Sequence, residues 1–171
     1  GSNWINSVEI NNENSASVTG IAGTSAVGTV TITNDNTASI TGLAGTSAVG
    51  SVTITANITT YAVTVATGTN SYGTGNKFYI DGSVSPTLNL SEGSTYRFDQ
   101  SDSSNSTHPL RFSTTANGSH GGGSEYTTGV TTNGTPGSSG AYTQITVASG
   151  APTLYYYCTN HSGMGGQANT P

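Results

Sequence analysis

STYRFDQ, residues 94–100, alternates large apolar side chains, Tyr96 and Phe98, with polar neighbours. Because successive side chains of a β-strand point to opposite faces, this alternation predicts a strand with one buried face. Other short runs rich in Val, Ile, Thr and Tyr are separated by Gly and Asn: YAVTVA (61–66), KFYIDG (77–82), TLNL (87–90), LRFSTT (110–115), AYTQITVA (141–148) and TLYYYC (153–158). Strands at this spacing predict an all-β fold, a two-sheet β-sandwich over residues 59–171.

The apolar faces of these strands are expected to form one hydrophobic core. Alternation places the inward positions at Val63, Val65, Phe78, Ile80, Leu88, Leu90, Tyr96, Phe98, Leu110, Phe112, Ile145, Val147, Leu154 and Tyr156. Segments rich in turn-forming residues are expected to join the strands, among them TGTNSYGTGN (67–76). The Gly-rich stretch 113–140 predicts either a loop excursion or weakly paired strands.

Residues 1–58 have a different organisation, because two similar segments follow one another. SVTGIAGTSAVGTVTIT (17–33) returns as SITGLAGTSAVGSVTIT (39–55) at an offset of 22 residues. Each segment predicts a short strand, a Gly-Thr-Ser loop and a second, alternating strand. Repeat units commonly need about three stacked copies or a partner to be stable. We therefore expect this β-repeat module to serve attachment or oligomerisation, with Trp4 and Ile5 as anchors; a module that folds alone is the alternative.

The composition argues against several classes of function. Only 6% of the residues are charged, the net charge is −5, and Lys77, Arg97 and Arg111 are the only cationic side chains besides histidine. Such a surface offers no basic patch to a phosphate backbone, so we expect no nucleic-acid partner. No apolar stretch is long enough to cross a membrane, so we expect no membrane insertion. The single cysteine cannot form an internal disulfide.

The sequence contains no recognisable catalytic set, and we expect the protein not to be an enzyme. Hydrolysis by paired carboxylates needs two of them facing each other across a cleft, whereas the carboxylates here are scattered along the chain. GTGN (73–76) predicts a turn rather than a phosphate-binding loop, because no helical pattern follows it.

CTNHSGM, residues 158–164, holds the only cysteine and the only methionine of the chain, with a histidine between them. Alternation in the preceding strand puts Cys158 on the core face at the strand end. The loop that follows can fold back and bring His161 and Met164 to the same point. His108 opens a strand 50 residues earlier, and a sandwich can bring the start of one strand beside the end of another. One thiolate, two imidazoles and a long thioether contact make a blue-copper ligand set.

The alternative is a structural role for these residues, because free cysteines are often simply buried and a histidine in a Gly-Ser loop is often solvated. His120, in SHGGGSEY (119–126), is expected to be a loop histidine of this kind. A second, weak metal site shared with Glu125 is the alternative for His120.

The pattern Cys-x-x-His-x-x-Met after an aromatic-rich last strand, with an upstream histidine, resembles the cupredoxins. The compact ligand loop is closest to that of the amicyanins. This resemblance covers about residues 59–171 and implies a cupredoxin-like Greek-key β-sandwich. It also implies one bound copper ion, with His108, Cys158, His161 and Met164 as metal ligands.

One residue departs from the cupredoxin pattern. Small cupredoxins usually have Asn after the first histidine, with a backbone N–H that donates to the cysteine sulfur. This chain has Pro109, which has no N–H, so that support of the site is lost. His-Pro occurs in multicopper oxidases, but Arg111 and Ser113 stand where those enzymes carry further histidines. Three histidines in all cannot build a trinuclear copper cluster.

The whole chain is also similar to virion proteins of marine cyanophages. Four segments resemble a module that recurs in their structural proteins: TGTNSYGTGNKFYIDG, TYRFDQSDSSNSTHPLRFSTT, GSEYTTGVTTNGTPGSSGAYTQITV and LYYYCTNHSGMGG. The repeat ITGLAGTSAVGSVTIT is also of a type seen there. This resemblance implies a structural protein of the virion surface, either a capsid knob or decoration protein or a tail-fibre component. Its implied partners are other virion proteins and the host cell surface, with a homo-oligomeric state.

Two functions from different classes follow. A virion surface protein predicts stable association through residues 1–58 and needs no redox activity. A blue-copper electron carrier, periplasmic or extracellular, predicts a reversible copper couple and an exposed apolar patch around His161. The loop around His161 is instead Thr, Asn, Ser and Gly, and electron transfer does not explain the repeat. The sequence therefore favours the virion protein.

Overall fold

The computed structural model describes residues 5–12, 15–19, 22–23, 27–34, 37–41, 44–45 and 52–170, with side chains described from residue 57 onward. Strands account for almost all the regular structure of these residues, which confirms the all-β prediction; the exceptions are two short 3₁₀ helices, η1 (Ser103–Asn105) and η2 (Gly118–Gly121). In the described part of the chain, no helix has the length and apolar character needed to cross a bilayer. The chain divides into two compact units, Gly1–Ile58 and Thr59–Pro171, at the position where the sequence pattern changes.

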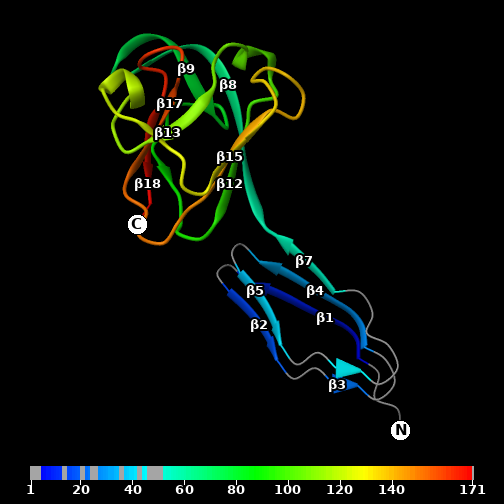
Figure 1. Cartoon of the computed structure of the whole chain (residues 1–171). Coiled ribbons are helices and arrows are strands. Elements are labelled where there is room, and N and C mark those ends of the chain that lie inside the picture. The colour runs from blue at the N-terminus through cyan, green and yellow to red at the C-terminus, as the bar shows by residue number, and fades with distance from the viewer. Residues whose placement is uncertain are drawn as a thin grey trace. The chain divides into compact units, whose positions relative to one another are not determined.

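The first unit consists of parallel strands that repeat along the chain (Figure 1). Its largest sheet has the order β1 (Ile5–Asn12), β4 (Val27–Asn34), β7 (Val52–Ala56). The shorter strands pair as β2 (Ser15–Thr19) with β5 (Thr37–Thr41) and β3 (Ala22–Gly23) with β6 (Ala44–Gly45). Each pairing joins residues that are 22 positions apart, such as Val8 with Val30 and Ile10 with Ile32. The repeat therefore stacks upon itself in register.

The stacking adds one strand to the repeat that the sequence comparison missed. Strand β1, INSVEINN, pairs with β4 in the same 22-residue register in which β4 pairs with β7. It keeps Val8 opposite Val30, Ile10 opposite Ile32 and Asn12 opposite Asn34, but differs at its other paired positions. The β1–β4–β7 sheet is therefore three strands deep, whereas the β2–β5 and β3–β6 pairings have two strands each among the described residues. The proposed anchor Trp4 and the side chain of Ile5 lie outside the described residues, so an attachment contact through them stays a prediction.

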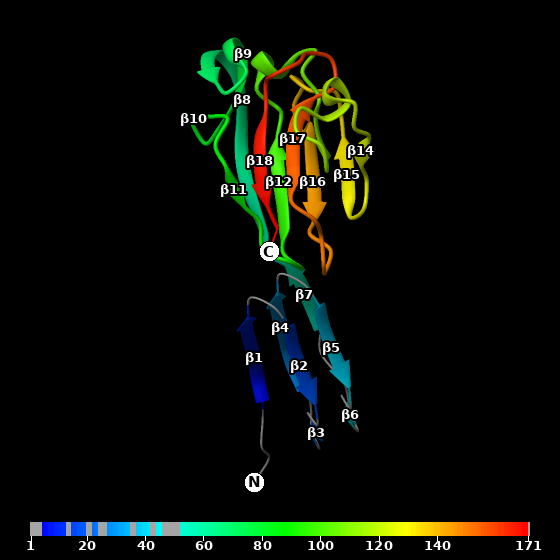
Figure 2. The same ribbon diagram turned by 90° about the vertical axis from the view of Figure 1, so that its left-hand side faces the viewer.

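The second unit is a sandwich of two sheets, whose strands are seen lengthwise in Figure 2. The six-stranded sheet has the order β10 (Ser83–Val84), β9 (Gly73–Ile80), β8 (Ile58–Asn70), β12 (Thr95–Asp99), β16 (Tyr142–Thr146), β15 (Val130–Asn133). The five-stranded sheet has the order β11 (Leu88–Asn89), β18 (Gly166–Asn169), β17 (Leu154–Cys158), β13 (Leu110–Ser113), β14 (Glu125–Tyr126). Strand β11 runs parallel to β18, whereas β13 and β17 are antiparallel.

One hydrophobic core joins the two sheets of this unit. All predicted inward residues are buried in it except Val65, which is partly buried and packs against it. The rings of Phe98 on β12 and Phe112 on β13 meet edge to face, with centroids 5.4 Å apart. Cys158 and Met164 belong to the same core. The alternation of apolar residues thus identified the buried face of every long strand of the sandwich.

Three details differ from the sequence interpretation. The segment 67–76, expected to be a connecting turn, is instead the paired end of the β8–β9 hairpin, whose ladder continues to Asn70 and Gly73. Stretch 113–140 contains η2, β14 and β15, which matches the expectation of weakly paired strands. Strand β18 was not foreseen, because GQAN has no apolar alternation beyond the buried Ala168.

Candidate metal centre

Two neighbouring strands bring the predicted ligands together. Cys158 is the last residue of β17 and pairs with Leu110, the first residue of β13. His108 lies two positions before that partner. Because the two strands are antiparallel, the beginning of β13 lies beside the end of β17. The ladder therefore places His108 next to Cys158, despite 50 residues of intervening chain.

The three ligand atoms point toward one another. The Cys158 Sγ lies 3.8 Å from Nδ1 of His108 and 3.7 Å from Nδ1 of His161. One ligand atom from each of these residues lies within 4.8 Å of the others. Metal–sulfur and metal–nitrogen bonds of about 2.3 and 2.0 Å together exceed both sulfur–nitrogen distances. One ion can therefore contact the thiolate and both imidazoles, and this cluster could hold a metal.

The cluster is mostly withdrawn from water. Cys158 is 1% exposed and His108 is 8% exposed, whereas His161 is exposed. Burial raises the pKa of the Cys158 thiol, and backbone N–H groups of Asn160 and His161 directed at the sulfur partly oppose this rise. Burial also lowers the pKa of His108, with a smaller contribution from the charge of His161. His108 is thus kept neutral, the form in which imidazole binds metals.

Met164 is placed on the same loop as His161 and is buried at 1% exposure. It belongs to the core cluster that contains Cys158. Its carbonyl oxygen accepts hydrogen bonds from the Phe78 N–H at 2.9 Å and from the Ser85 hydroxyl at 3.0 Å. The main chain of Met164 is therefore fixed, and its role as a fourth ligand stays a prediction.

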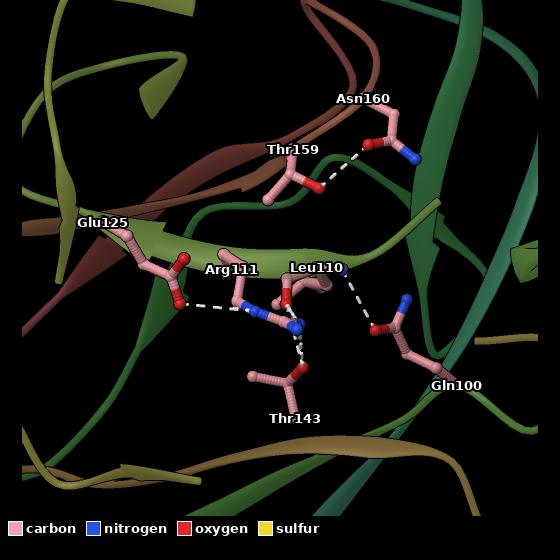
Figure 3. A network of polar contacts seen from close by, with 7 residues as sticks. All are labelled: Gln100, Leu110, Arg111, Glu125, Thr143, Thr159 and Asn160. Atoms are coloured by element: carbon pink, nitrogen blue, oxygen red, sulfur yellow. Dashed lines mark hydrogen bonds and ion pairs between the residues drawn. The ribbon is translucent and has the colours of Figure 1, made fainter. Parts of the chain in front are cut away.

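A buried glutamine holds the segment that carries His108. The Gln100 side chain, which is 1% exposed, donates from Nε2 to the His108 carbonyl at 2.8 Å. Its Oε1 accepts from the Leu110 N–H at 3.0 Å, the contact drawn in Figure 3. Gln100 thus bridges the backbone on both sides of Pro109. The His108 N–H in turn donates to the Asn105 carbonyl at 2.8 Å.

Pro109 has compensating contacts around it. The backbone N–H groups of Asn160 and His161 donate to the Cys158 sulfur. These two donors can take the place of the N–H that Pro109 lacks. The Pro109 carbonyl accepts from the Thr159 N–H at 3.1 Å. The Asn160 side chain, shown in Figure 3, donates to the Thr107 carbonyl at 2.9 Å. The two ligand-bearing segments are therefore joined directly to each other.

The loop that carries His161 and Met164 is tied down at Gly163. Its N–H donates to Oδ1 of Asn117 at 2.7 Å. Its carbonyl accepts from Asn70 Nδ2 at 3.0 Å and from Lys77 Nζ at 2.8 Å. Lys77 is only 3% exposed, so the side chain of a buried lysine stabilises this loop through its hydrogen bond to Gly163. Sequence analysis had not singled out Asn70, Asn117 or Gln100, because isolated amides carry no motif.

His120 and Glu125 have separate partners. The Glu125 Oε1 lies 3.3 Å from Arg111 Nε, and Arg111 also donates to the Leu110 carbonyl at 2.8 Å (Figure 3). His120 Nε2 lies 3.1 Å from the Cys158 carbonyl. The alternative of a second metal site shared by His120 and Glu125 is therefore unsupported. His120 instead contacts the backbone of Cys158.

Comparisons with family models, with curated proteins and with solved structures find no match for this chain. The function must therefore be argued from the residues themselves. The strongest feature is the cluster of one thiol and two imidazoles at the edge of the sandwich core.

Proposed function

We propose that residues 59–171 form a cupredoxin-like, Greek-key domain that binds one copper ion through His108, Cys158 and His161. Met164 completes the set as a longer thioether contact. The convergence of the cysteine sulfur and the Nδ1 atoms of both histidines supports this proposal. When bound, copper supplies a one-electron couple between Cu(I) and Cu(II). The protein side chains hold the ion and shield it from water.

The donor set favours copper over other common metals. A thiolate with two imidazoles and a weak thioether suits copper, whereas structural zinc sites usually have four Cys or His ligands. Among the described residues, the cluster offers three such ligands. Cys158 belongs to the same hydrophobic core as Leu110, its partner on β13, and Tyr156, and an apolar surrounding of this kind controls solvent access to a bound metal.

Visible absorption during titration with Cu(II) tests the copper proposal. The reduced protein should develop an intense blue band that saturates at one copper per chain. Cys158→Ser should lose the band, while Ser113→Ala, a control on the neighbouring strand, should keep it. A colourless wild-type complex would refute a thiolate–copper site. Saturation with zinc that copper cannot displace would identify a zinc site instead.

The second candidate concerns the biological setting. We propose that the chain is a structural protein of a phage particle surface, a capsid knob or decoration protein or a tail-fibre component. The in-register stacking of the 22-residue units in the first unit supports this role. Stacked parallel strands form quasi-one-dimensional solenoids, which suit a rigid spacer or attachment module with other virion proteins as partners. Antibodies against the chain should label intact particles, and particles without label would contradict the proposal.

The electron-carrier alternative makes a different prediction. A carrier needs an apolar docking surface near its exposed ligand, but Asn160, His161 and Ser162 are all exposed polar residues. We therefore assign copper to the particle-surface protein as a bound ion rather than as a mobile redox centre. Rapid, reversible electron exchange with a small redox protein, measured by stopped-flow absorption of the blue band, would reverse this assignment.

A further inference from the structure

The sandwich unit also contains a hollow, which is separate from the cluster of the Cys158 thiol and the His108 and His161 imidazoles. It has a volume of about 380 Å³ and is formed by the β8–β9 turn, β10 and residues of β17 and β18; these elements can be located in Figure 2. Pockets for small molecules have volumes of roughly 300–1,000 Å³. Hence the hollow is large enough for a small ligand.

The lining of the hollow is uncharged. Among the described residues that form it there is no Asp, Glu, Lys, Arg or His. A charged ligand would lose hydration on entering and would gain no opposite charge in return. The occupant that fits this lining is therefore neutral.

Two exposed apolar side chains line the hollow. Tyr72 is 47% exposed and Val84 is 37% exposed, and they are the exposed large hydrophobic residues among the side chains that the structure describes. Both line this hollow. Exposed apolar side chains that border a concave surface can contact the apolar part of a ligand. Tyrosine suits such a place because its ring packs on apolar groups while its hydroxyl forms hydrogen bonds.

The floor of the hollow is polar and rigid. Asn70 Nδ2 donates to Ser85 Oγ at 3.1 Å and to the Gly165 carbonyl at 3.2 Å, so this amide holds the floor in place. Other polar groups are available for a ligand. Within the described part of the chain, no hydrogen bond is formed by the hydroxyls of Tyr72, Thr87 and Tyr155.

We propose that this hollow, the Tyr72 pocket, binds the neutral pyranose ring of a carbohydrate. A pyranose has an apolar face of C–H groups, which can pack against the Tyr72 ring and Val84. Its hydroxyls can exchange hydrogen bonds with the free hydroxyls and amides of the lining. A purely apolar ligand would leave those polar groups without partners. The proposal is independent of copper binding, since none of the three clustered ligands lines the pocket.

Saturation-transfer NMR on the metal-free full chain tests the proposal. The probes are methyl glycosides of glucose, galactose and mannose, together with N-acetylglucosamine. Glucuronic acid is the charged counterpart, and glycerol is a polyol without a ring. At least one neutral sugar should receive saturation at its ring C–H protons, with millimolar Kd. Glucuronic acid and glycerol should receive at least tenfold less.

Matched variants locate the binding. Tyr72→Ala removes the exposed ring and should weaken binding at least tenfold, and Thr87→Val should weaken it several-fold by removing one hydroxyl. Tyr142→Ala removes a tyrosine that lies under the Arg97 guanidinium, outside the pocket, and should leave the Kd unchanged. The proposal is overturned if no neutral sugar receives saturation, if Tyr72→Ala binds like the wild type, or if glucuronic acid binds best. None of these outcomes bears on the proposal of copper binding.

Discussion

Replacing Gln100 with Ala should weaken both the fold and metal binding, for reasons that can be separated. The change removes the donor to the His108 carbonyl, at 2.8 Å, and to Asn105 Oδ1, at 3.2 Å, and the acceptor for the Leu110 N–H, at 3.0 Å. Both backbone groups belong to residues that are at most 8% exposed. The strand segment after Pro109 loses its main side-chain support.

The size of the effect follows from the three groups that lose their Gln100 partner. A buried hydrogen-bonding group left without a partner costs about 1–3 kcal/mol. Three such groups give a loss of about 3–9 kcal/mol in the free energy of unfolding. Water that enters the vacated space would favour the lower half of this range. This is a large share of the roughly 5–15 kcal/mol that stabilises a typical domain. Loss of an outer contact of this kind typically reduces metal affinity about 10–100-fold.

Two assays separate stability from positioning. Urea denaturation of the metal-free chain gives the free energy of unfolding, and competition with a chromogenic chelator gives the Cu(I) affinity of the folded protein. Gln144→Ala is the matched control, because Gln144 also accepts side-chain hydrogen bonds, at 2.9 and 3.0 Å, but from Arg97. It should cost about 1 kcal/mol and leave the copper affinity unchanged.

The outcomes discriminate clearly. A folded Gln100→Ala protein with wild-type copper affinity would refute the positioning role of Gln100. A loss of less than about 1 kcal/mol in the free energy of unfolding would refute the expected cost of leaving these buried groups without hydrogen-bond partners. Gln100→Glu keeps an acceptor for the Leu110 N–H but turns a carboxylate toward the His108 carbonyl. It should therefore recover little of the copper affinity.

The remaining predictions concern pH and the ligand loop. The lowered pKa of His108 means that the metal-free protein should lose stability as pH falls below about 6.5, and His108→Gln should flatten that acidic limb in denaturation curves. The raised pKa of the Cys158 thiol should make stability fall as pH rises above about 8.5; an alkaline limb unchanged in Cys158→Ser would contradict this. Gly163 has φ of 74°, and a Cβ there would lie 2.9 Å from Tyr72 Cβ, so Gly163→Ala should cost about 1–3 kcal/mol and weaken copper binding. Wild-type melting and copper titration curves for Gly163→Ala would show that the loop tolerates the change.

The sandwich was largely predictable because its strands follow a local rule. Residues such as Phe78, Phe98 and Ile145 alternate with polar neighbours, and burial of one face requires that alternation. The first strand of the repeat was missed because β1 is identical to β4 only at Val8, Ile10 and Asn12. Strand β18 was missed because its pairing with β17 and β11 depends on backbone hydrogen bonds rather than on an apolar pattern.

The sequence by itself determined which residues could bind a metal. It places a thiol at Cys158 and an imidazole at His161 in one short loop, and a second imidazole at His108 before an upstream strand. Only the tertiary structure decided that their ligand atoms meet, because the antiparallel register of β13 and β17 sets the distance between His108 and Cys158. Likewise, the hollow beside Tyr72 arises between distant segments, and the supporting role of Gln100 depends on how the chain folds back between residues 100 and 110. Such contacts have no local signature, because hydrogen bonds and concave surfaces depend on positions in space and not on neighbours along the chain.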